Sequence, residues 1–224
     1  MPDAVIRLAI VGAESTGKTT LAAALAPRLA KDSGLRVTWV PEVLREWCQH
    51  MGRTPRVHEQ AALVRAQHER IEAAAATHDV VICDTTALLT TVYSRMVFAD
   101  RSLDERALAL HARMSLTLLT ALDLPWVADG IQRDGPHVRE PVDRLLRELL
   151  IAYRLPWSLV AGHGAARVEA AVDAVAPLLR AHADGRGGLF TRLAERNAEP
   201  AARRWRCENC DDPACEHRLL KPRY

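Results

Sequence analysis

Residues 12–19 read Gly-Ala-Glu-Ser-Thr-Gly-Lys-Thr and match the pattern G-x-x-x-x-G-K-[ST] at every fixed position. The two glycines let the backbone wrap closely around a phosphate chain, so that its N–H groups and the positive end of the next helix face the anion. In this pattern Lys18 reaches the β- and γ-phosphates, and the Thr19 hydroxyl ligates Mg²⁺. The stretch therefore predicts a site for a nucleoside triphosphate and Mg²⁺, and it leaves the preferred triphosphate open. We expect nucleotide contacts from Gly12, Glu14, Ser15, Thr16, Gly17, Lys18, Thr19 and Thr20.

The sequence on either side of this loop has the order strand, loop, helix that such a site requires. Short apolar runs then alternate with longer helical patterns along the chain. We expect strands at 5–11, 37–40, 80–83, 116–122 and 157–161, and helices at 18–31, 41–50, 58–77, 103–114, 138–153 and 167–182. This alternation predicts an α/β fold with a five-stranded, mostly parallel sheet and helices on both faces. Such sheets bind their ligands outside the carboxyl ends of the strands.

Length and composition limit the domain organisation, the partners and the location that this protein can have. The chain has 224 residues, 49% of them hydrophobic, which is enough for one α/β domain at residues 1–184 and a small appendage. Its net charge of +2 does not indicate a nucleic-acid partner. No apolar run approaches the roughly 18 residues of a membrane span, and no signal peptide is recognisable. We expect a cytoplasmic protein without a membrane partner, with Cys48 and Cys83 as buried thiols; a homo-oligomer stays open.

A carboxylate follows the expected second strand. Glu42 comes just after the run 37–40 and lies one helical turn from Arg45 and Glu46. Glu42 is the candidate general base for a substrate hydroxyl, and the other two side chains are candidate acceptor contacts. The alternative is that Glu42 only begins a helix, whose dipole favours a negative charge there.

A second carboxylate, Asp84, closes the apolar run 80–83. An acidic residue in this place organises Mg²⁺ together with Thr19, or it faces the acceptor. The sequence leaves both roles open.

The segment after the expected fourth strand combines an acid, glycines and arginines. We predict that this loop closes over the phosphates and that Arg133 and Arg139 clamp the transferred group. Trp126 and Asp129 are candidate acceptor contacts in the same segment. The alternative is a solvated, charged loop.

Together, the segments 12–19, 41–46, 83–85 and 126–133 resemble the ribosylnicotinamide kinase domain of the bacterial NAD-biosynthesis regulator, within the P-loop nucleoside kinases. The resemblance extends from about residue 5 to residue 179. It implies a P-loop NTPase kinase fold and transfer of the γ-phosphoryl group of ATP to the 5′-hydroxyl of nicotinamide riboside, a step of NAD salvage. Because the chain begins almost directly at the first strand, we expect neither adenylyl transfer nor a DNA-binding repressor domain.

Two other functions stay open. One is a kinase for another nucleoside or small metabolite. The other is a regulatory P-loop ATPase that uses its cysteine-rich tail to bind a partner.

That tail has no place in a kinase core. Beyond an expected linker at 185–204, residues 205–224 contain the pattern C-x2-C-x4-C-x-H. Cysteine and histidine are zinc ligands, and C-x2-C is a common spacing in zinc sites. We predict structural Zn²⁺ bound by Cys207, Cys210, Cys215 and His217. A site shared between two chains, or a redox-active pair of Cys207 and Cys210, stays open.

Overall fold

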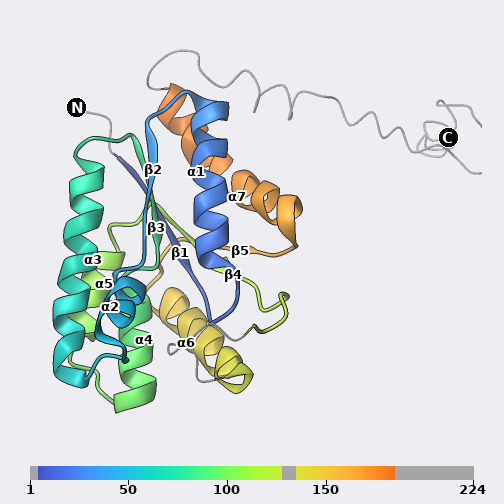
Figure 1. Ribbon diagram of the computed structural model, residues 1–224. Helices are drawn as coiled ribbons and strands as arrows, with labels where there is room; N and C mark the ends of the chain where they lie inside the picture. The colour runs from blue at the N-terminus through green and yellow to red at the C-terminus, as the bar shows by residue number, and fades with distance from the viewer. Residues whose placement is uncertain (1–4, 128–134, 185–224) are drawn as a thin grey trace, which may run out of the picture. The chain divides into compact units, whose positions relative to one another are not determined.

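The computed structural model describes residues 5–127 and 135–184, and within these ranges five strands form one sheet (Figure 1). The strand order is β2-β3-β1-β4-β5, and every neighbouring pair is parallel. In the centre, Ala9 of β1 lies opposite Cys83 of β3 and Thr117 of β4. The carboxyl ends of the strands therefore meet at one edge. The strands are β1 (Ile6–Val11), β2 (Val37–Val40), β3 (Val80–Asp84), β4 (Leu116–Thr120) and β5 (Trp157–Val160).

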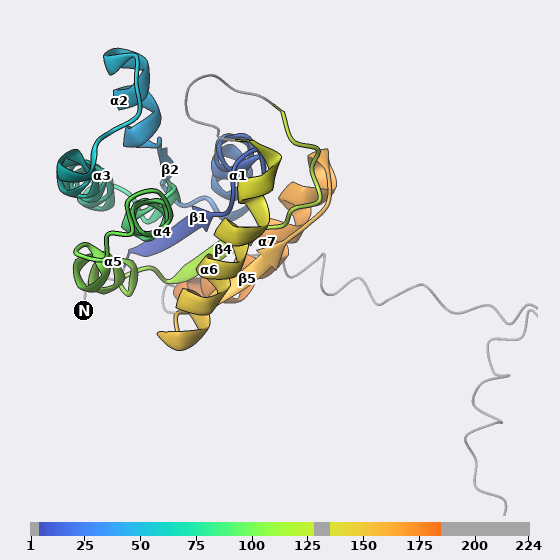
Figure 2. The ribbon, with the colours of Figure 1, turned by 90° about the horizontal axis from the view of Figure 1, so that it is seen from below.

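Helices cover both faces of this sheet. Helices α1 and α7 lie on one face, and α3, α4, α5 and α6 lie on the other (Figure 1 and Figure 2). Helix α2 packs against α3. The helices are α1 (Lys18–Ser33), α2 (Val43–Met51), α3 (Gln60–Ala75), α4 (Ala87–Phe98), α5 (Asp104–His111), α6 (Arg139–Ala152) and α7 (Gly164–Asp184), with 3-10 turns η1 (Val57–Glu59) and η3 (Pro136–Val138).

The strands are apolar on both sides because both faces of the sheet are covered. In β1, residues Ala9 and Val11 join the core cluster that includes Val92 of α4 and Leu146 of α6. Helix α1 presents an apolar stripe at helical spacing, with Leu21, Ala22, Leu25, Ala26 and Leu29 buried. The α/β sheet predicted from the sequence is confirmed, and it is parallel throughout the described strands.

Helix α4 is the main element that the sequence analysis missed. Its middle contains Thr90, Thr91 and Val92, β-branched residues that are poor intrinsic helix formers. Residues over a wide arc of the helix are buried, including Leu88, Leu89, Thr91 and Val92, and apolar residues such as Val97 lie outside this arc, so the sequence shows no clear polar face. Packing against α3, α5 and α6 forms this helix where propensity alone does not indicate one.

The other element boundaries differ from the predicted ones by a few residues. The helix expected from residue 41 begins at Val43, because Glu42 has an extended backbone with φ −69° and ψ 114°. Cys48 and Cys83 are buried and form no disulfide within the described residues, as predicted, and burial raises the pKa of Cys83 to about 12. No helix in the described ranges combines the length and apolarity needed to cross a bilayer. Asp129, Arg133, the linker at 185–204 and the tail at 205–224 lie outside these ranges.

Candidate active site

The phosphate-binding loop connects β1 to α1 at the carboxyl edge of the sheet. Gly12 has φ +157°, and a Cβ added there would lie 2.0 Å from Thr120 Oγ1 of β4. Gly17, the residue before α1, has φ 74°, in the left-handed region. Both positions therefore require glycine, one for space and both for conformation.

The hydroxyls of Thr16 and Thr120 bind backbone carbonyls of this loop and of the end of β1. Thr16 Oγ1 donates to Ala13 O at 2.8 Å and lies 2.7 Å from Thr120 Oγ1. Thr120 Oγ1 in turn donates to Val11 O at 3.2 Å. Lys18 Nζ donates to Ala13 O at 2.8 Å, so the lysine lies across the same loop. The loop is thus ordered by its own side chains and by β4.

Thr19 and Asp84 meet at the edge of the sheet. The register of β1 and β3 places Ile10 opposite Asp84, and the Thr19 hydroxyl donates to Asp84 Oδ2 at 2.6 Å. Burial raises the pKa of Asp84, although the Thr19 hydrogen bond and the charge of Lys18 oppose this effect. The other oxygen, Asp84 Oδ1, is buried and has no hydrogen-bond partner among the described residues.

This pair suits a magnesium ion. Mg²⁺ prefers oxygen ligands and is commonly bound through one or two carboxylates together with substrate phosphates. Asp84 Oδ1 is a buried carboxylate oxygen to which none of the described residues donates a hydrogen bond, and the Thr19 hydroxyl binds the other oxygen of the same carboxylate. In the described ranges no cluster of three or more His, Cys, Asp or Glu side chains occurs, and a site of this kind does not need one.

Glu42 lies at the end of β2, directly before α2. Its side chain is 12% exposed, and its Oε2 lies 3.9 Å from Arg45 Nε. Burial raises the pKa of Glu42, and the nearby charge of Asp84 adds to this effect, whereas Lys18, Arg45 and a Thr85 hydrogen bond oppose it. A carboxylate with a raised pKa beside the phosphate-binding lysine is suited to accept a proton from a substrate hydroxyl.

Thr85 connects the two carboxylates through a strained backbone. Its φ is 67°, a left-handed conformation that is an outlier for a β-branched residue. Its N–H donates to Ile10 O at 3.0 Å, and its hydroxyl hydrogen-bonds Glu42. Strain of this kind persists only where the surrounding structure imposes it. Here it turns the chain directly after Asp84 and places the Thr85 hydroxyl on Glu42.

A cleft of about 150 Å³ opens beside these groups. Its polar end contains Lys18, Glu42 and Arg45, and its apolar wall comes largely from α4. This wall was not predicted from the sequence, because α4 was not predicted. The lining residues are Glu14, Ser15, Lys18, Glu42, Leu44, Arg45, Cys48, Thr54, Pro55, Gln60, Leu89, Thr90, Tyr93, Val97 and Phe98.

Other predicted contacts lie farther from this cleft. Glu46 is exposed and forms an ion pair with Arg70 of α3 at 2.7 Å, and it does not line the cleft. Thr20 is exposed on α1. Trp126 is half-buried, and its indole Nε1 has no hydrogen-bond partner within the described part of the chain. Arg139 is buried, and its Nη2 donates to Leu124 O at 2.8 Å, so it holds the loop after β4 in this structure.

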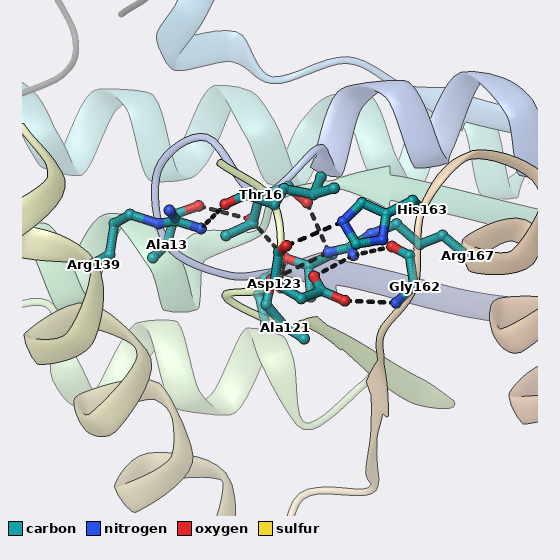
Figure 3. A network of polar contacts seen from close by, with 11 residues as sticks. Ala13, Thr16, Ala121, Asp123, Arg139, Gly162, His163 and Arg167 are labelled. Carbon is teal, nitrogen blue, oxygen red and sulfur yellow. Dashed lines mark hydrogen bonds and ion pairs between the residues drawn. The ribbon is translucent and has the colours of Figure 1, made fainter. Parts of the chain in front are cut away.

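An arginine that the sequence analysis did not single out lies beneath the loop. Arg167 of α7 donates to Thr16 O at 2.9 Å and to Asp123 Oδ1 at 2.7 Å (Figure 3). Arg167 belongs to no recognisable motif, so no local signal in the sequence distinguishes it. In the chain, Arg167 is 44 residues from Asp123 and 151 residues from Thr16, so only folding brings these partners together.

The sheet, the glycine loop and the pair of Thr19 and Asp84 define a P-loop nucleotide-binding domain with the architecture of small-molecule kinases. Residues 7–167 match the family described as AAA domain. The chain belongs to this family, because the match covers more than half of its length. No curated protein matches the sequence.

Solved structures with a similar fold include NadR and small-molecule kinases. The NadR protein in complex with NR shares 20% identity with a TM-score of 0.63, over 78% of this chain and 50% of that one. The NadR protein with NAD and AMP-PNP shares 20% identity with a TM-score of 0.61, over 79% and 50%. Thymidylate kinase from Ehrlichia chaffeensis shares 16% identity with a TM-score of 0.54, over 78% and 98%.

This chain spans about half the length of the NadR structures that it matches. At these identities the likeness concerns the fold. It confirms the predicted P-loop kinase fold, and it confirms at the level of the fold the resemblance drawn from the sequence motifs.

Proposed function

We propose that this protein is an ATP-dependent kinase that phosphorylates the 5′-hydroxyl of nicotinamide riboside and forms nicotinamide mononucleotide, as a cytoplasmic enzyme of NAD salvage. One observation carries the proposal. Lys18 of the phosphate-binding loop and the largely buried carboxylate Glu42 line one cleft, and Asp84, which the Thr19 hydroxyl contacts, lies close enough for its charge to act on Glu42. A triphosphate site beside a buried base and an acceptor pocket is the arrangement that phosphoryl transfer requires.

The chain itself performs three tasks in this reaction. Loop N–H groups and Lys18 hold the triphosphate, and Thr19 with Asp84 would hold Mg²⁺. Mg²⁺ supplies charge neutralisation on the phosphate oxygens when it is bound. Glu42 accepts the proton of the acceptor hydroxyl as the phosphoryl group moves in line towards it. Positioning and electrostatics provide most of the rate in such reactions.

The cleft also suits an acceptor that combines an aromatic ring with a sugar. Tyr93 and Phe98 of α4 offer ring faces or edges, and Leu89 adds apolar surface on the same side. Glu42 and Arg45 at the other end offer partners for hydroxyl groups. The NadR structure with NR supports this choice of acceptor among nucleosides.

The decisive experiment measures ADP release by the purified protein with Mg-ATP and a panel of acceptors. The panel contains nicotinamide riboside, common nucleosides and deoxynucleosides, and one control reaction lacks an acceptor. We expect strong stimulation by nicotinamide riboside alone and loss of turnover in Lys18→Ala, with the protein still folded. Stimulation by a different nucleoside would replace the substrate and keep the mechanism, and hydrolysis without any acceptor would indicate a regulatory ATPase.

The base role of Glu42 has its own test. Glu42→Gln should lower kcat by roughly 100-fold or more and change the KM for ATP much less, because a general base acts in the chemical step. Since burial raises the pKa of Glu42, its carboxylate form is lost as pH falls through that raised value, and kcat/KM should fall with it. Glu69→Gln, an exposed position on α3, is the matched control. An unchanged rate in Glu42→Gln would exclude Glu42 as the base.

A further inference from the structure

The guanidinium of Arg167 lies beneath the phosphate-binding loop, with its side chain 5% exposed. Its Nη2 donates to Thr16 O at 2.9 Å and to Ala121 O at 3.2 Å. Its Nη1 donates to Gly162 O at 2.8 Å and to Asp123 Oδ1 at 2.7 Å. One side chain therefore joins the loop after β1, the end of β4 and the turn after β5 (Figure 3).

The position of this cation is unfavourable for the helix that carries it. Arg167 lies in the first turn of α7, where the helix dipole disfavours positive charge, and a buried charge must be paired. Asp123 supplies the pairing. Burial tends to raise the pKa of Asp123, but hydrogen bonds from Arg167 and from the N–H of Gly162 outweigh this effect and lower it. The ion pair thus serves the contacts between loops rather than the helix.

The contact with Thr16 O has a direct consequence for the phosphate site. In a trans peptide the C=O and the following N–H point in opposite directions. Because Arg167 binds the carbonyl of Thr16, the N–H of Gly17 points away from the Arg167 guanidinium. Gly17, at φ 74°, gives this peptide little resistance to rotation of its own.

We infer that Arg167 is a positioning residue for triphosphate binding, which keeps the peptide between Thr16 and Gly17 oriented with its N–H towards the phosphates. Asp123 orients the guanidinium for this task through Oδ1 and ties the turn after β5 through Oδ2, which accepts from Gly162 N at 2.6 Å. The inference rests on the nucleotide-binding part of the proposed function. It does not depend on the identity of the acceptor.

The test compares binding of inorganic tripolyphosphate and of the ATP analogue AMP-PNP by calorimetry, without any acceptor. Arg167→Lys keeps the charge but cannot reach four acceptors in the planar geometry of a guanidinium. We expect Arg167→Lys to lower the affinity for both ligands by a similar factor of about tenfold or more, which corresponds to the free energy of one charge-assisted hydrogen bond. Arg147→Lys, which alters an ion pair with Asp143 on α6, should leave both affinities unchanged.

A spectroscopic readout separates positioning from a general loss of stability. The amide signal of Gly17 should shift strongly when tripolyphosphate binds the wild-type protein and weakly in Arg167→Lys. If Arg167→Lys does not fold, Asp123→Asn provides the second variant, with the same direction of change and a smaller size.

Each other outcome overturns a defined statement. Wild-type affinity for tripolyphosphate in Arg167→Lys, or weakened binding of AMP-PNP alone, would overturn the role of Arg167 in the loop. A wild-type protein that binds neither ligand would overturn the nucleotide site itself, and with it the proposed function.

Discussion

Gly12 approaches β4 so closely that no side chain fits, and this contact gives a prediction at the scale of one residue. Gly12→Ala would place a Cβ 2.0 Å from Thr120 Oγ1, whereas Gly52→Ala, at φ +65°, meets no atom within 4 Å. Both variants pay the cost of a positive φ. Only Gly12→Ala adds overpacking, so urea unfolding should show it less stable than Gly52→Ala by about 1–3 kcal/mol.

The binding measurement should agree with the stability measurement. Gly12→Ala should also lose affinity for AMP-PNP, because the clash displaces the hydroxyls of Thr16 and Thr120 that hold the loop. Equal stability of the two variants would mean that the loop can move away from β4 at little cost.

Local residues of the candidate site could be predicted and remote ones could not. Gly12, Lys18 and Thr19 belong to one short pattern whose spacing reflects the geometry of a phosphate chain. Arg167 and the strained Thr85 carry no such pattern. Their roles depend on a carbonyl distant in the chain and on a backbone angle that no sequence position announces.

At the scale of elements, α4, α5 and β4 are joined by a buried histidine. His111 at the end of α5 is 1% exposed, and its Nδ1 and Nε2 each lie 2.8 Å from a threonine hydroxyl, that of Thr86 before α4 and that of Thr117 in β4. Burial lowers the pKa of His111 to about 4. The neutral ring is therefore part of the folded structure.

The lowered pKa predicts a pH dependence of stability. The unfolded chain binds a proton at His111 below about 6.5, and the folded protein does so only below about 4. The contribution of His111 to the free energy of unfolding is fully present above about pH 6.5. It is lost as the pH falls towards about 4, and the total loss is on the order of 3 kcal/mol. Urea unfolding across this range should show the loss. His111→Gln should flatten the curve in this window, whereas the exposed His50→Gln should leave it unchanged.

Helix α4 shows what element prediction lacks. Its sequence is apolar on most sides and contains three consecutive β-branched residues, so neither periodicity nor propensity indicates a helix. Packing against helices α3, α5 and α6 stabilises the helical conformation of this segment. The apolar wall of the cleft, built by Leu89, Tyr93 and Phe98, depends on this packing and was therefore missing from the prediction.

At the scale of the whole molecule, the parallel sheet assembles the site. Thr19 and Asp84 are 65 residues apart in the chain, yet their side chains are 2.6 Å apart because β1 and β3 are neighbours. The rule that ligands bind at the carboxyl ends of such strands predicted this meeting. It did not predict that Glu46 would turn to Arg70, outside the cleft.

The zinc site predicted for the tail can be tested on the full-length protein. If the prediction is right, Cys207, Cys210, Cys215 and His217 bind one Zn²⁺ ion per chain. Metal analysis of the purified protein should give about one zinc per chain, and the double variant Cys207→Ser/Cys210→Ser should lose it while ADP release with Mg-ATP and acceptor continues. Zinc retained by the double variant would exclude this ligand set, and loss of ADP release would connect the tail to the kinase reaction.

The phosphate-binding loop, the alternation of strands and helices and the carboxylates after β2 and β3 could be recognised in the sequence, because these features depend on residues close together in the chain. Helix α4, the cleft beside Glu42 and the hydrogen bonds of Arg167 became visible only in the folded structure. These depend on packing and hydrogen bonds between segments distant in the chain, and their energies arise only when the sheet has brought those segments together.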